Sequence, residues 1–169
     1  MAGLKMNYCM QCGAKLTTRH LDLEGEVPYC ETCGEFRFPV FSTAVSMIVT
    51  TRERDKILLI KQYGRDSYIL VAGYVNKGED AEDAVAREIR EEVGLHVLEM
   101  HFNRSHFFEP SNTLMLNYTA IVEDAPPQSN NEVDDWAWMT IEEARERIRP
   151  RSLAESFLTG FFDGFYTFS

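Results

Sequence analysis

The sequence predicts a mixed α/β domain that follows a small, cysteine-rich, metal-stabilised module. All four cysteines fall within residues 1–40, in two C-x2-C pairs. From Phe41 onward, short β-branched and aromatic segments precede and follow one central amphipathic helix. Hydrophobic residues make up 44% of the 169-residue chain, which indicates a packed core rather than disorder. We therefore expect one medium-sized folded chain with a short N-terminal appendage.

The net charge of the chain limits the kinds of molecule that it is expected to bind. The formal net charge is -10 and the pI is near 4.9. Acidic residues outnumber basic ones by five to four in 1–40 and by twenty-two to thirteen in 41–169. An acidic surface repels nucleic-acid backbones and anionic membranes, which disfavours a general nucleic-acid binder. Because no apolar signal core and no run approaching ~18 apolar residues is found, we expect a cytoplasmic protein with no membrane partner.

The two cysteine pairs predict a metal site. Cys9 and Cys12 form one pair, Cys30 and Cys33 the other, and seventeen residues separate the pairs. This spacing is typical of a four-cysteine zinc ribbon, in which each pair places two thiolates on one tetrahedral ion. A disulfide pair or free thiols are the alternatives, and the redox poise of the cytosol disfavours the disulfides. Since protein ligands would fill all four positions, we expect a structural Zn²⁺ rather than a catalytic one.

The second part is predicted to place strands on both sides of one central helix. The strand-like segments are 41–50, 56–63, 68–75, 96–108, 113–122 and 135–139. Asp80 is a plausible N-cap of the central helix, and Gly94 is a natural stop at its C-terminus. Thr140, followed three residues later by Glu143, resembles a capping box and predicts a second helix. Residues 151–165 predict a third helix that closes the chain.

Three glutamates on the central helix indicate a cation site. Glu88 and Glu92 are four residues apart, and Glu91 lies within the same turn. Like charges at this spacing repel by roughly 0.2–0.5 kcal/mol. Dense carboxylate oxygens suit Mg²⁺ or Mn²⁺, and Mg²⁺ in proteins usually retains waters and takes substrate phosphates. We therefore expect a divalent cation that removes the repulsion, together with a phosphorylated substrate.

The residues around this helix resemble the Nudix hydrolases. Gly73, Glu79, the Arg87–Glu88 pair and the run that ends at Gly94-Leu95 match the Nudix box at every specified position. The resemblance implies an α/β/α sandwich around a mixed sheet over residues 39–169, preceded by the zinc ribbon at 1–38. It also implies attack of water on a pyrophosphate that links a nucleoside to another group.

The same resemblance assigns roles to individual residues. Glu88 and Glu92 would be the main metal ligands, and Glu91 a further ligand or the base that takes the proton of the attacking water. Gly73 would offer its carbonyl oxygen to the metal. Glu79 and Arg87 would pair and hold the loop against the helix, which is a structural rather than a chemical role. The helix would end at Gly94.

A more distant glutamate is a further candidate for the metal site. Many Nudix enzymes carry one before a Trp-containing strand, and here Glu132 lies six residues before Trp138. We expect Glu132 to be an extra metal ligand or base. Asp134 or Asp135 could take that part instead, or all three could lie on the loop surface.

A zinc ribbon ahead of a Nudix domain resembles the NADH pyrophosphatase subfamily, which splits NAD(H) into nicotinamide mononucleotide and AMP and can remove NAD caps from RNA. Tyr74 stands where that subfamily has an aromatic that stacks on the substrate. Ala154 stands where the alanine backbone of its tail approaches the phosphates, and Phe108 replaces the tryptophan of its S-Q-P-W-P-F-P-x-S motif. The central prolines of that motif are missing here and Glu109 adds an acid, so base specificity is open.

The resulting hypotheses differ in substrate and in class. NAD(H) is the leading substrate, ADP-ribose or another nucleoside diphosphate derivative is the second, and a Nudix-fold binding protein without turnover is the third. NAD-capped RNA is an optional partner, and a homodimer is another, because related enzymes are often dimers. Arg65 could reach a phosphate from its strand loop, or it could be a solvated turn arginine.

Overall fold

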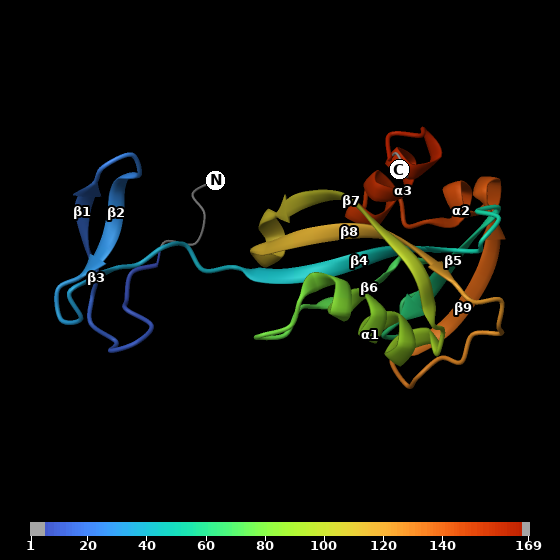
Figure 1. The fold of residues 1–169 in the computed structure, drawn as a ribbon, viewed down its shortest axis with the longest axis horizontal. Coiled ribbons are helices and arrows are strands. Elements are labelled where there is room, and N and C mark those ends of the chain that lie inside the picture. Colours follow the sequence, from blue (N-terminus) through green and yellow to red (C-terminus); the bar gives the residue numbers. More distant parts are fainter. Residues whose placement is uncertain (1–5, 167–169) are drawn as a thin grey trace.

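The computed structural model describes residues 6–166, in two differently built parts joined by the extended stretch 37–41 (Figure 1). The first part is a three-stranded antiparallel sheet in the order β1-β2-β3. Its strands are β1 (Thr17–Leu21), β2 (Gly25–Cys30) and β3 (Glu35–Phe36). The boundary predicted between residues 38 and 39 falls in the connecting stretch, and the division into two domains stays a prediction.

A six-stranded mixed sheet forms the second part. Its strands are β4 (Ser42–Thr50), β5 (Lys56–Gln62), β6 (Val71–Tyr74), β7 (Val97–Phe108), β8 (Thr113–Val122) and β9 (Val133–Thr140), with a short 3₁₀ turn, η1 (Glu109–Ser111), between β7 and β8. The order is β7-β8-β4-β5-β9, and β6 also pairs with β4. The β4–β8 pair is parallel and the other pairs are antiparallel, which makes the sheet mixed.

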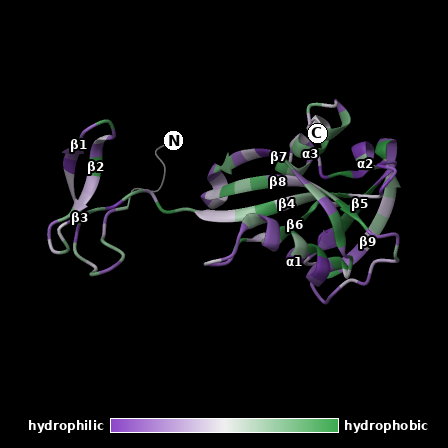
Figure 2. Ribbon diagram, viewed as in Figure 1, coloured by the Kyte–Doolittle hydropathy of each residue, from purple (hydrophilic) through white to green (hydrophobic). Residues whose placement is uncertain are grey.

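Helices cover both faces of this sheet (Figure 1). On one face lies α1 (Ala81–Val93), whose Ala84, Val85, Ile89 and Val93 are buried against the central strands. On the other face, α2 (Ile141–Arg147) and α3 (Leu153–Phe162) close a second core that contains Phe157 and Leu158. Hydrophobic residues are concentrated in the central strands, and hydrophilic residues in the bordering loops (Figure 2). The predicted α/β/α sandwich is confirmed.

The predicted helix ends agree with the structure. Asp80 occupies the N-cap of α1, although its side chain makes no capping hydrogen bond. Gly94 adopts a left-handed φ of 69° and donates its N–H to the Arg90 carbonyl, which is the conformation glycine favours after a helix. Thr140 and Glu143 form a reciprocal capping box at the start of α2.

Two strands begin more than one residue away from the predicted position. β6 begins at Val71 rather than at residue 68, because Ile69 forms an isolated bridge with Ile60 instead of joining the ladder to β4. β9 begins at Val133 rather than at residue 135, because a bulge lets Val133 pair with Gln62 at the end of β5. This bulge brings the loop before β9 next to the end of β5. Among the described residues, no helix is long and apolar enough to cross a membrane.

Candidate active site

Helix α1 presents two of the predicted ligands toward strand β6. Glu88 and Glu92 lie one turn apart on the face of α1 that packs against the sheet. A Cβ atom built at Gly73 would overlap the carboxylate of Glu88, so the strand approaches the helix only because residue 73 lacks a side chain. The backbone of Gly73 and the Glu88 carboxylate are therefore held in direct contact.

The carboxylate of Glu92 is buried and only half satisfied. The residue is 4% exposed, and Gln62 Nε2 donates to its Oε1 at 2.8 Å. Its Oε2 is buried, and no group in the described part of the chain forms a hydrogen bond with it. Burial raises the pKa of Glu92 to about 7, and the neighbouring Glu88, Glu132 and Glu91 add to the rise. An unpaired buried carboxylate oxygen is costly unless a cation or donor completes it.

In this arrangement Arg87 offsets the repulsion among the glutamates. Its Nε and Nη2 donate to the two carboxylate oxygens of Glu79 at 2.7 and 2.9 Å. Its Nη1 donates to Glu88 at 2.7 Å and to Glu91 at 3.1 Å, and Nη2 also reaches the Tyr74 carbonyl. Five contacts from one guanidinium fasten the loop after β6 to the middle of α1. Two of the five contacts are to Glu79, the residue predicted to pair with Arg87, and the structural role assigned to the pair stays a prediction.

Acid should weaken this fastening. Arg87 and the Asn76 N–H hold the pKa of Glu79 down to about 2. A carboxyl group with a depressed folded-state pKa adds stability above its unfolded pKa, and this contribution is lost as pH falls through about 4.5 toward 2. We expect Glu79→Gln to lower the thermal midpoint at pH 7. The gap to the wild type should close near pH 2, and a gap independent of pH would contradict the assignment.

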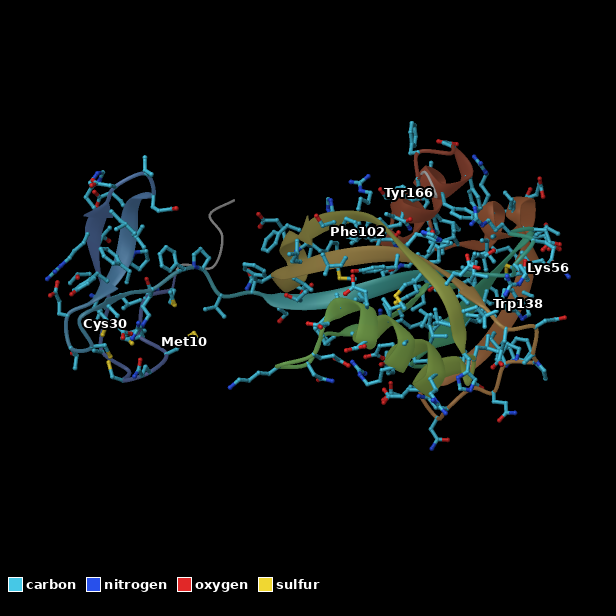
Figure 3. The ribbon with its side chains drawn as sticks, in the orientation of Figure 1. Met10, Cys30, Lys56, Phe102, Trp138 and Tyr166 are labelled. Carbon is cyan, nitrogen blue, oxygen red and sulfur yellow. The ribbon has the colours of Figure 1, made fainter. Side chains whose placement is uncertain are left out.

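The glutamates open onto a cavity of about 390 Å³. Its lining includes Glu88, Glu92 and Glu132, the Gly73–Tyr74 backbone, Tyr63, Asn76, Ser111, Thr113 and Met115. The unpartnered Glu92 oxygen, the glycine cradle and an all-oxygen donor set fit a hard divalent cation such as Mg²⁺ or Mn²⁺. A cavity of equal volume lies near Lys56 and Trp138, labelled in Figure 3, and none of the predicted site residues lines it.

The three acidic candidates at the start of β9 take different partners. Glu132 lines the cavity, and its Oε2 lies 3.5 Å from the Tyr63 hydroxyl. Asp134 instead accepts the Gly64 N–H at 2.7 Å, and Asp135 accepts the Tyr68 hydroxyl at 3.1 Å. The two aspartates therefore fasten the start of β9 to the segment that follows β5. Glu132 is the carboxylate that lines the cavity.

Three of the residues predicted to act on the metal, the water or the substrate lie outside the cavity lining. Glu91 is exposed, its side chain at 57%, and it contacts Arg87. Phe108 ends β7 and is paired with Thr113 across the strand turn. Ala154 packs on the second core on the far face of the sheet. Tyr74, by contrast, lines the cavity and is 60% exposed. The roles assigned to all four stay predictions.

Gln62 and Tyr63 are site residues that the sequence reasoning missed. Gln62 ends β5 and is buried, and a polar residue that closes an apolar strand is a signal that could have found it. Tyr63 and Gly64 form a tight turn with φ values of 58° and 67°, closed by the Arg65 N–H donating to the Gln62 carbonyl. This is a type I′ geometry, in which the first position favours asparagine, aspartate or glycine.

A bulky residue at this turn position carries strain, typically about 1–3 kcal/mol. We expect Tyr63→Asn to raise the free energy of unfolding by about 1 kcal/mol, because asparagine tolerates left-handed backbone. Chemical denaturation measures it. Tyr63→Phe keeps the strain and is the matched control, with no gain in stability expected. A loss of stability in Tyr63→Asn would show that packing of the tyrosine ring outweighs the strain.

The four cysteines converge in the first part of the chain. Their sulfur atoms all lie within 4.8 Å of one another, with 3.9 Å between Cys9 and Cys33 and 3.5 Å between Cys12 and Cys30. Four thiolates on a tetrahedral Zn²⁺ at 2.3 Å would stand about 3.8 Å apart. No disulfide forms among them. The cluster thus fits the expected four-cysteine metal site.

Electrostatics also favour a cation within this cluster. A side-chain hydrogen bond from Arg37 lowers the pKa of Cys9 to about 6. The adjacent sulfurs, chiefly that of Cys12, raise the pKa of Cys33 to about 12. Without a cation, four crowded thiolates repel one another, and a bound metal reverses that effect.

Loss of one cysteine should therefore unfold the small module. We expect Cys9→Ser to release the bound metal and lower the thermal midpoint of this part. Metal content by elemental analysis and thermal unfolding measure the two effects. Met10→Ser, at an exposed neighbouring position, is the matched control. Full metal content and unchanged stability in Cys9→Ser would contradict the structural role.

The comparisons with known proteins agree with this geometry. Residues 40–157 match the NUDIX domain family, so the chain belongs to the Nudix family. It is similar to "NAD-capped RNA hydrolase NudC" of Pseudomonas aeruginosa (strain LESB58), with 30% identity over 87% of this chain and 52% of that protein. The protein of the same name in Stutzerimonas stutzeri (strain A1501) is 34% identical over 80% of this chain and 48% of its own length.

The chain thus spans about half the length of the curated relatives that it matches. Among solved structures, a Nudix hydrolase from Nitrosomonas europaea superposes with a TM-score of 0.69 at 20% identity, covering 97% of both chains. That likeness supports the fold alone. The family match confirms the expected family, the Nudix hydrolases.

Proposed function

We propose that the chain is a Mg²⁺-dependent pyrophosphohydrolase that cleaves the diphosphate of a nucleoside diphosphate derivative, with NAD(H) split into nicotinamide mononucleotide and AMP as its leading reaction. One observation carries the proposal. Among the described residues, the buried Glu92 carboxylate has an oxygen without a partner, and Glu92 lines the same cavity as Glu88 and Gly73. A bound cation would stabilise a buried carboxylate whose oxygen has no partner. Mg²⁺ in proteins usually also binds phosphate oxygens of the substrate.

The mechanism follows from the positions of the chain's own groups. When bound, the cation neutralises charge on the pyrophosphate and acidifies water. Glu88 and Glu92 hold the ligand oxygens in place, since α1 and Gly73 fix the first and Gln62 orients the second. Glu132 opens onto the same cavity and is our proposed base, with Glu91 the alternative. The proton of the attacking water passes to that carboxylate as the phosphorus–oxygen bridge breaks.

The preference for NAD(H) rests on two supports. The relatives are described as NAD-capped RNA hydrolases, so NAD-capped RNA is a further candidate substrate. Tyr74 presents an exposed ring at the cavity, where it can stack on a nicotinamide or adenine face. We also propose that the four-cysteine site holds structural Zn²⁺. The four cysteines form no disulfide, which suits a reducing, cytoplasmic location.

ADP-ribose or another nucleoside diphosphate derivative is the second candidate. It is favoured by the segment that follows β7, where Glu109 begins the short turn whose Ser111 lines the cavity. Glu109 adds an acid at that turn, and Phe108 does not line the cavity. Both features change the part of the cavity wall that would receive the second half of a dinucleotide. Specificity can therefore have changed while the metal site is kept.

Steady-state kinetics test the proposal. NADH, NAD⁺, ADP-ribose and FAD would be compared by kcat/KM at millimolar Mg²⁺ and after chelation. We expect NADH to have the highest value, with turnover lost in the chelator. A preference for ADP-ribose would transfer the function to the second candidate. No hydrolysis of any substrate would leave a Nudix-fold binding protein and overturn the enzymatic proposal.

A further inference from the structure

A second, smaller cavity shares Tyr63 with the cavity that contains the glutamates. Its volume is about 130 Å³, and it is lined by Tyr63, Arg65 and Arg149 together with Gln62, Ser67 and Ile69. Tyr63 also lines the cavity that contains the glutamates. Tyr63, a residue that is 69% exposed, therefore borders both an acidic cavity and a basic one.

The two arginines are left without acidic partners. Among the described residues, neither Arg65 nor Arg149 forms an ion pair. The nearby acids are engaged elsewhere: Asp66 pairs with Lys61, and Asp134 accepts the Gly64 N–H. In a chain with a net charge of -10, two unpaired guanidinium groups beside one cavity are a local reversal of charge.

The backbone under both arginines is fixed. Arg65 closes the tight turn, its N–H donating to the Gln62 carbonyl at 3.2 Å. Arg149 donates its N–H to the Tyr68 carbonyl at 2.9 Å, and its own carbonyl accepts the Ser152 hydroxyl at 2.6 Å. The segment after α2 is thus fastened to the loop after β5, and the two arginines are brought to one place by this contact.

We propose that this basic cavity binds a second phosphate group of the nucleotide substrate, on the nucleoside whose pyrophosphate lies at the glutamates. Arginine forks match phosphate oxygens, and the tyrosine ring between the two cavities offers a face to the nucleoside. The strained turn at Tyr63 fits this use, because an unfavourable backbone is retained where it positions a functional side chain. The inference rests on the proposed function and names the kind of substrate for that site.

Such a phosphate has two sources. It is either a phosphomonoester on the ribose or the phosphodiester that joins the nucleoside to a following nucleotide. The kinetic test compares three substrates: NADH, NADPH with its ribose 2′-phosphate, and NAD extended by one nucleotide through a 3′-phosphodiester. The quantity measured is the ratio of kcat/KM for each phosphorylated substrate to that for NADH.

We expect Arg65→Gln and Arg149→Gln each to lower one of these ratios about tenfold, the loss of one charge-assisted contact to phosphate. Arg65→Lys, which keeps the charge but not the fork, should fall between. Arg52→Gln, at the opposite end of the sheet, is the matched control and should leave both ratios unchanged. The substrate whose ratio falls identifies the source. Ratios that stay the same in both glutamine variants would overturn the proposal.

A binding experiment keeps this test separate from the test of hydrolysis. Calorimetry would compare AMP with adenosine 2′,5′-bisphosphate and adenosine 3′,5′-bisphosphate in the full chain with Mg²⁺. We expect one bisphosphate to bind about tenfold or more tightly than AMP, and this advantage to vanish in Arg65→Gln. Equal affinity for all three ligands would refute the phosphate site even if NADH is hydrolysed. Preferential binding without hydrolysis would retain the site and refute the enzymatic proposal.

Discussion

Replacing Glu92 with glutamine is expected to lower hydrolysis by about a thousandfold or more while the protein remains folded. Glutamine has nearly the same shape and can still accept the hydrogen bond from Gln62. It removes the negative charge of a residue that is only 4% exposed and whose second carboxylate oxygen has no partner among the described residues. Activity with saturating Mg²⁺ measures the effect. Glu146→Gln, at an exposed position on α2, is the control and should retain activity.

In the metal-free protein, the same Glu92→Gln substitution should increase the free energy of unfolding although it lowers activity. A carboxyl group whose folded pKa is raised destabilises the fold above its unfolded pKa, and the penalty is complete above the folded pKa of about 7. The metal-free Glu92→Gln variant should therefore be more stable than wild type at pH 8, by up to roughly 3 kcal/mol. The two proteins should converge near pH 4. Normal activity in this variant would defeat the metal-site account, and a less stable variant at pH 8 would contradict the buried-charge explanation.

Replacing Gly73 with alanine is expected to lower activity by about a hundredfold or more with a small loss of stability. The new methyl group would occupy the space of the Glu88 carboxylate. Because that carboxylate is the end of a flexible side chain, it should swing away rather than unfold the strand. The proposed ligand would then leave the metal. Activity and the affinity for Mn²⁺, measured by electron paramagnetic resonance, should fall together.

A compensating variant separates this steric effect from general damage. Glu88→Asp shortens the side chain and makes room for a methyl group at position 73. The double variant Gly73→Ala with Glu88→Asp should therefore lose less than the two single losses combined. Strictly additive losses would show that the contact between Gly73 and Glu88 is not what restricts residue 73 to glycine.

Most of the fold could be predicted because each element carries a local signal. The capping box at Thr140 and the glycine after α1 fixed two helix ends, and β-branched segments gave the strands. The elements that were misjudged depend on distant partners. β6 is short because Ile69 pairs with Ile60 instead of β4, and β9 starts early because a bulge joins Val133 to Gln62. Such pairings are decided by tertiary contacts rather than by the segment itself.

In the candidate site, too, some residues could be predicted from local sequence and others depend on distant contacts. Glu88, Glu92 and Gly73 follow from one helix and one strand, so their spacing in the sequence was enough to bring them together. Gln62 ends another strand and Tyr63 lies in the turn after it, and the sequence does not show which glutamates these two residues contact. The cation that balances the glutamates in this structure is Arg87, which the sequence reasoning had paired with Glu79 alone.

Product identification in ¹⁸O-labelled water tests the central claim most directly. The full chain with Mg²⁺ would be incubated with NADH, and the products analysed by mass spectrometry beside the Glu92→Gln variant. The account predicts AMP and reduced nicotinamide mononucleotide, with one ¹⁸O atom on one of the two phosphates, and no such products from the variant. Intact NADH, cleavage that releases free nicotinamide, or equal products from the variant would contradict it.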